Sequence, residues 1–128
     1  MMQTLIPKWQ IVTGWVLSSI LALLFLPSAF FKIAQPAGFL EGWTQSYPAG
    51  AARPLGVIEL TMFALYLAPK TRYLGGLVML AYLGGAVATH LHAEDGMFPV
   101  PVVVGIIAWL GLYLRDRKLR ALVPTVAE

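Results

Sequence analysis

The sequence predicts an all-α membrane protein, a polytopic four-helix bundle that forms a single integral membrane domain over residues 1–128. Two observations on composition exclude other classes. Hydrophobic residues make up 59% of the chain and charged residues 12%, about half the charged share of a soluble domain. A soluble domain of this length could not bury so much apolar surface, and the mean hydropathy of +0.75 excludes a disordered chain. The third observation is a set of four apolar runs, which suit helices that cross a bilayer.

Charged residues and prolines mark the ends of these runs. Lys32 ends the first, Pro54 opens the second and Pro69 ends it, and Pro99 opens the fourth, where a missing N–H is harmless. The first run is too long for a typical signal peptide, so we expect a retained helix. The predicted spans are 9–31, 54–68, 73–91 and 98–114.

The connection at 34–52 differs from a solvated linker. It contains prolines and glycines, but also Phe39, Trp43 and Tyr47. Aromatic side chains of this kind favour the membrane interface, so we expect an interfacial segment that lies on the membrane.

The distribution of basic residues predicts the orientation. In a four-span arrangement only Lys32 and Arg53 fall on one side, and seven basic residues fall on the other. The positive-inside rule then places both termini in the cytoplasm. The net charge of +3 follows from this topology, so we expect the lipid bilayer as a partner and no nucleic acid. The seven basic residues on the predicted cytoplasmic side are Lys8, Lys70, Arg72, Arg115, Arg117, Lys118 and Arg120.

Two kinds of chemistry are excluded or disfavoured. The chain has no cysteine, which excludes disulfides, thiolate metal sites and thiol redox catalysis. His90 and His92 lie near Glu94 and Asp95, but residues two apart on a helix point to different faces, so no metal site is expected.

Glu59 is the first candidate functional residue. It lies six residues after Arg53, about 9 Å along a helix and therefore inside the apolar region. An ionised carboxylate there needs a partner, and Lys32, Arg53 and His90 are the candidate cations. Glu59 is either one half of a structural ion pair or a functional acid, base or ligand contact.

The second candidate is His90, which can serve as an acid, a base or a proton relay, or can simply mark a helix end. Lys32 follows Ser28 by four residues on one helix face, and either pairs with Glu59 or extends to the headgroups. We therefore predict Glu59 and His90 as catalytic residues. The predicted ligand-binding residues are Ser28, Lys32, Arg53, Met62, Phe63, Tyr66 and Thr89.

Small residues four apart on the third run indicate close helix packing. One stripe contains Ala81, Gly85 and Thr89, and another contains Gly84 and Ala88. Such seams are typical of contacts between membrane helices, within one chain or in a homo-oligomer.

The order of several short motifs resembles the DoxX-like family of small bacterial membrane proteins. Ser28-Ala29-Phe30-Phe31-Lys32 closes the first run and Pro54-Leu55-Gly56-Val57-Ile58-Glu59-Leu60 opens the second. Leu74-Gly75-Gly76-Leu77-Val78-Met79 opens the third run, and Gly85-Ala86-Val87-Ala88-Thr89-His90-Leu91 closes it. The family often has glycine where this chain has Ser28-Ala29.

The resemblance implies a four-helix bundle in the bacterial inner (plasma) membrane. Some relatives are associated with quinone-linked oxidation, and others with redox complexes or the assembly of membrane proteins. Three functions compete. Proton-coupled transport is the least favoured, because four helices are few for alternating access and an oligomer would be needed. The other two are more favoured. One is a buried polar site that binds or turns over a small lipophilic molecule, with a quinone as the candidate ligand. The other is a non-catalytic accessory subunit or assembly factor for a partner membrane protein. The sequence does not decide whether the protein is an enzyme.

Overall fold

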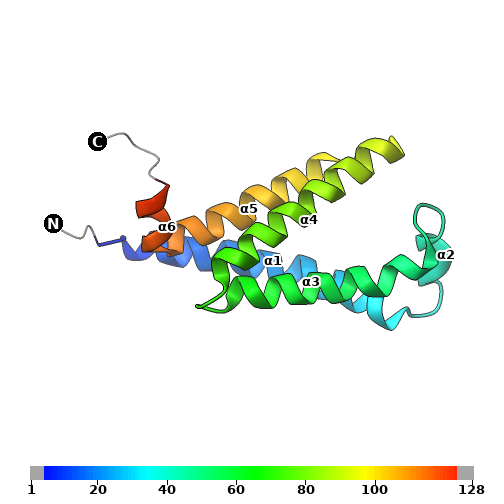
Figure 1. The fold of residues 1–128 in the computed structure, drawn as a ribbon, viewed down its shortest axis with the longest axis horizontal. Coiled ribbons are helices and arrows are strands. Elements are labelled where there is room, and N and C mark those ends of the chain that lie inside the picture. Colours follow the sequence, from blue (N-terminus) through cyan, green and yellow to red (C-terminus); the bar gives the residue numbers. More distant parts are fainter. Residues whose placement is uncertain (1–4, 124–128) are drawn as a thin grey trace.

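The fold is a bundle of four long helices, as seen in a computed structural model that describes residues 5–123 (Figure 1). Two short helices and one 3-10 turn complete the described part of the chain. The long helices are α1 (Lys8–Ala34), α3 (Ala52–Leu67), α4 (Arg72–Ala93) and α5 (Pro99–Arg115); the short elements are α2 (Phe39–Trp43), η1 (Ala49–Ala51) and α6 (Arg117–Leu122).

The long helices have the character of membrane spans. Three segments are long and apolar enough to cross a bilayer, namely α1, Ala49–Leu67 and α4, and α5 is apolar over 17 residues. Large apolar side chains such as Leu23 and Leu77 point outward and are 75% and 67% exposed. In water such a surface would be unfavourable, whereas in lipid it is the expected one.

The four helices form a closed ring in which α1 contacts α3 and α5, and α4 contacts the same two helices. Figure 1 shows the start of α1, the α3–α4 turn and α6 at one end, which we call the packed end. At the other end, α4 and α5 diverge from α1 and α3, and α2 lies beyond α3 (Figure 1). We call this the open end.

Glycines hold the helices close together at the packed end. A Cβ on Gly14 would lie 2.8 Å from the Gly111 carbonyl oxygen, and a Cβ on Gly75 would collide with the backbone of Tyr66. Fully buried Tyr66 donates its hydroxyl to the Ala108 carbonyl at 2.6 Å. These contacts explain why the bundle is narrow here, since only glycine permits such close backbone approach.

The glycines in the small-residue stripes of α4 do not provide the close packing that was predicted within one chain, and packing between copies of the chain stays a prediction. A Cβ on Gly84 or Gly85 would meet no described atom within 4 Å, so these glycines pack against no other helix of the chain. Close packing of α4 occurs at Gly75 and Gly76 instead. The physical reason is the divergence of α4 from α1 and α3, which moves its second half away from these two helices while α5 stays beside it (Figure 1).

A buried acidic group stabilises the packed end and was not predicted. Asp116 is 2% exposed and forms an ion pair with Arg72 at 2.5 Å. It also accepts hydrogen bonds from the Tyr73 hydroxyl at 2.7 Å and from the Leu119 backbone N–H at 2.8 Å. The second bond caps α6, so Asp116 connects α4, α5 and α6.

Candidate functional site

The open end contains a cavity of about 490 Å³. All four long helices line it, together with the segment around α2. Most of the lining is apolar, and the polar or amphipathic side chains come from α1, the α2 segment, α3 and α4. These are Ser28, Lys32, Trp43, Tyr47, Glu59, Tyr82, Thr89 and His90.

The centre of the site is an ion pair between α1 and α3. Lys32 Nζ lies 2.7 Å from Glu59 Oε1, and the two side chains are 14% and 3% exposed. Gly56 makes this approach possible, because a Cβ there would lie 2.8 Å from a side-chain carbon of Ile33 and 3.0 Å from the Ala29 carbonyl oxygen. The glycine therefore brings the two helices close enough for lysine to reach glutamate.

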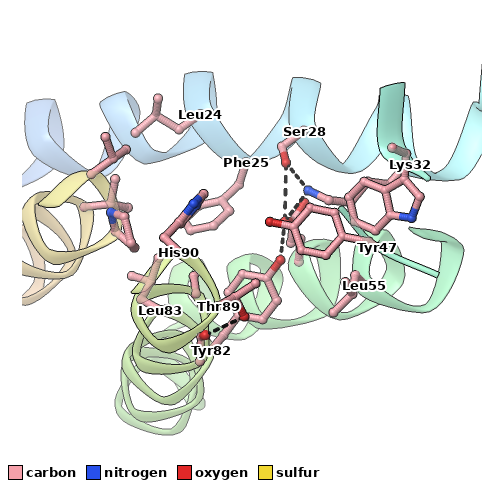
Figure 2. Close-up of a pocket in the computed structure, with 17 residues that line it drawn as sticks. Leu24, Phe25, Ser28, Lys32, Tyr47, Leu55, Tyr82, Leu83, Thr89 and His90 are labelled. Atoms are coloured by element: carbon pink, nitrogen blue, oxygen red, sulfur yellow. Dashed lines mark hydrogen bonds and ion pairs between the residues drawn. The ribbon is translucent and has the colours of Figure 1, made fainter. Parts of the chain in front are cut away.

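Three donors converge on the same carboxylate oxygen. Besides Lys32, the hydroxyls of Tyr82 and Ser28 donate to Glu59 Oε1 at 2.5 Å and 3.3 Å. Lys32 also donates to Ser28 Oγ at 2.5 Å, which the i, i+4 spacing on α1 allows. Figure 2 shows the side chains from α1 and α4 converging on this network.

The second carboxylate oxygen of Glu59, Oε2, lacks the donors that surround Oε1. Oε2 is buried and has no hydrogen-bond partner within residues 5–123. A buried carboxylate oxygen without a donor is unfavourable, and native structures seldom contain one. Glu59 lines the cavity, so a molecule in the cavity would lie beside the residue that carries this oxygen.

His90 lies at the edge of the site and connects it to the α4–α5 turn. Its Nδ1 is 2.6 Å from an oxygen of the exposed Asp95, whose other oxygen accepts from the Met97 backbone N–H at 2.8 Å. The hydrogen bond from His90 is the main cause that holds the pKa of the Asp95 carboxyl below its ordinary value. Positive φ angles at Glu94 (54°) and Gly96 (73°) form the turn that places Asp95 there.

The segment between α1 and α3 covers the cavity with aromatic rings. The Trp43 and Tyr47 ring centroids are 4.5 Å apart, and the Trp43 indole N–H donates to the Pro48 carbonyl at 2.9 Å. Lys32 Nζ lies 6.0 Å from the Trp43 ring centroid. Trp43 and Tyr47 of the segment predicted to be interfacial form part of the cavity wall.

Five of the nine residues predicted for the site line the cavity, namely Ser28, Lys32, Glu59, Thr89 and His90. Glu59 and His90 face the same cavity but bond to different partners. The Thr89 hydroxyl donates to the Gly85 carbonyl within α4 at 2.9 Å.

The other four predicted residues lie elsewhere. Arg53 donates to the carbonyl of Ile33, near the end of α1, at 3.2 Å rather than to Glu59. Met62, Phe63 and Tyr66 share the buried side of α3 with Glu59, but they lie one or two turns closer to the packed end and belong to the core.

Sequence reasoning missed Tyr82, the third donor to Glu59. Its signal is the spacing to Thr89 and His90, seven and eight residues later, which places the three on neighbouring positions of one helix face. For metal ligands, no group of three His, Cys, Asp or Glu residues that could hold an ion occurs in the part of the chain that the structure describes.

Comparisons with known proteins identify a family for this chain. The sequence model of the DoxX-like family matches residues 16–111, three quarters of the chain, and this range includes every residue that lines the cavity. No curated protein and no solved structure matches the chain.

Proposed function

Because the chain belongs to the DoxX-like family and its apolar helices indicate a multi-pass membrane protein, we propose that the cavity binds a small lipophilic molecule with a polar head group. A quinone or its reduced form is the candidate class. The observation that carries the proposal is Glu59, a residue in the lining of a largely apolar cavity whose buried Oε2 has no donor among the described residues.

The size and lining of the cavity support a ligand of this kind. Small-molecule sites measure about 300–1,000 Å³, are mostly apolar and hold a few convergent polar groups. The cavity has about 490 Å³, with Phe25, Leu83 and Val104 among its apolar walls. The head group would face Glu59, and the lipophilic body would contact these walls.

Two groups at the cavity can exchange protons or hydrogen bonds with such a ligand. Glu59 Oε2 would accept a proton or a hydrogen bond from the head group. His90 lines the cavity and bonds to Asp95, which is exposed, so the pair connects the ligand to the aqueous edge of the bundle. In this proposal the imidazole passes protons between the ligand and Asp95.

We place the cavity in the outer half of a bacterial inner membrane. Lys8, Arg72 and the basic residues of α6 lie near the packed end, away from the cavity. The positive-inside rule assigns such an end to the cytoplasm. The two chain ends themselves lie outside the described residues.

Two neighbouring glycines allow a matched test. Gly85 lines the cavity and has no atom within 4 Å of an added Cβ, so Gly85→Leu should extend into the cavity and reduce its volume. Gly84 has equally open surroundings but does not line the cavity, so Gly84→Leu is the control. Both proteins and the wild type would be purified in native lipid, and the bound small molecules identified by mass spectrometry.

We expect a small molecule with the wild type and with Gly84→Leu, and its loss with Gly85→Leu. Retention in both variants would contradict the proposal. A stoichiometric membrane protein in place of a small molecule would instead favour the accessory-subunit function.

A further inference from the structure

We propose that the ligand's head group is a hydrogen-bond donor, so that the site prefers a hydroquinone, or another lipid-soluble compound with a hydroxyl head, over the corresponding carbonyl compound. This inference rests on the proposed function and specifies its ligand. It follows from the uneven distribution of donors around Glu59.

The carboxylate of Glu59 can only accept hydrogen bonds while it is paired with Lys32. All three donors that reach it bond to Oε1, and Oε2 has none among the described residues. A ligand hydroxyl would satisfy Oε2. A ligand carbonyl would place a second acceptor against it, which leaves both oxygens unsatisfied.

The other hydroxyls at the cavity offer little to a carbonyl head group. Those of Ser28 and Tyr82 already donate to Glu59, and that of Thr89 donates to a backbone carbonyl. The hydroxyl of Tyr47 can donate or accept, so it does not distinguish the two forms of a ligand. Lys32 donates to Ser28 and Glu59 and has a third N–H, from which a ligand hydroxyl and a ligand carbonyl can both accept. Only the hydroxyl can also donate, so the discrimination depends on Glu59.

The charge of the site favours a neutral donor over a cation. An ammonium head group could also donate to Glu59 Oε2, but the Lys32 ammonium lies 2.7 Å from the same carboxylate and already balances its charge. A second cation would be repelled at short range in a medium of low dielectric constant. A hydroxyl donates without adding charge.

Three matched probes test the inference: a decyl-tailed benzoquinone, its hydroquinone and the dimethyl ether of that hydroquinone. The ether keeps the reduced ring but has no donor. Binding to the full chain in lipid nanodiscs would be measured by calorimetry without oxygen, with empty nanodiscs to correct for partition. One hydrogen bond to a charged acceptor corresponds to about tenfold to a hundredfold in affinity. We therefore expect the affinity for the hydroquinone to be about tenfold to a hundredfold higher than that for the quinone or the ether.

A change at Glu59 should reverse the preference. In Glu59→Gln the amide oxygen can keep the three donors, and the amide NH₂ then takes the place of Oε2. We expect this variant to bind the quinone more tightly than the hydroquinone. Asp116→Asn, at the packed end, changes a buried carboxylate outside the cavity and should keep the wild-type preference.

Each outcome has one meaning. Equal binding of the three probes by the wild type, or an ether that matches the hydroquinone, would overturn the inference and leave the proposed function standing. If no probe binds, quinones are not the ligand class, and the proposed function of quinone binding is wrong. The wild-type comparison decides the matter even where Glu59→Gln does not fold.

Discussion

Replacement of Lys32 by methionine should destabilise the bundle, because it leaves the Glu59 carboxylate buried without its counter-ion. Methionine keeps most of the apolar stem that packs between α1 and α3 and removes only the ammonium. At the observed 2.7 Å, Coulomb's law with an effective dielectric constant of about 20 gives about 6 kcal/mol of attraction.

Part of this attraction offsets the cost of removing both charges from water, so the measurable loss is smaller. Removal of one partner of a buried ion pair costs about 3–5 kcal/mol. Lys32 and Glu59 are 14% and 3% exposed, so solvent screens the pair little. We therefore expect Lys32→Met to lower the free energy of unfolding by about 3–5 kcal/mol.

A double-mutant cycle separates the charge effect from lost packing. Unfolding would be followed by circular dichroism as denaturing detergent is added, for the wild type, Lys32→Met, Glu59→Leu and the double variant. The double variant contains no buried charge at this site and should be more stable than either single variant. If Lys32→Met costs less than about 1 kcal/mol, or if the double variant loses the sum of the two single losses, the ion pair does not stabilise the bundle as argued.

Three further predictions concern other parts of the molecule. Tyr82→Phe removes a donor to the buried carboxylate and should lower the free energy of unfolding by about 1–3 kcal/mol in the same assay; an unchanged value would mean that the hydroxyl makes no net contribution. Gly75→Ala places a methyl group against backbone and should cost about 1–3 kcal/mol, whereas Gly84→Ala should cost nothing or stabilise; equal effects would contradict the close packing. The hydrogen bond from His90 lowers the pKa of Asp95 from 3.8, so the contact should be stable above the ordinary pKa and be lost as the pH falls through the lowered value. Carboxyl NMR should show this titration move upward in His90→Gln, and no movement would refute the pairing.

The positions of the four long helices could be predicted because they depend on local properties. Apolar runs between charged residues and prolines leave few alternatives, and the helices begin and end within about three residues of the predicted limits. The short helix α6 was missed, because its charged sequence is also what a cytoplasmic flank of a span looks like. Only the fold shows that Asp116 in this run is buried and caps a helix.

The candidate site could be predicted in part. A carboxylate in an apolar span requires a partner, so the pairing of Glu59 with Lys32 was among the alternatives. The sequence could not predict whether Lys32 or Arg53 pairs with Glu59, because that choice depends on how α3 is rotated against α1. Tyr66 shares a helix face with Glu59, but periodicity gives no information on where a cavity ends along that face. Tyr82 was missed for a related reason, since its role depends on the divergence of α4.

The close pairing of lysine and glutamate has a consequence for how the site responds to its surroundings. Two opposite charges at 2.7 Å form a dipole with no net charge, so a neutral ligand enters or leaves without carrying charge through the electric field. Ligand affinity should then vary little with ionic strength or with the voltage across the bilayer, which act on net charges. Vesicles that hold the same amount of reduced ligand should load this protein to the same extent with and without a membrane voltage.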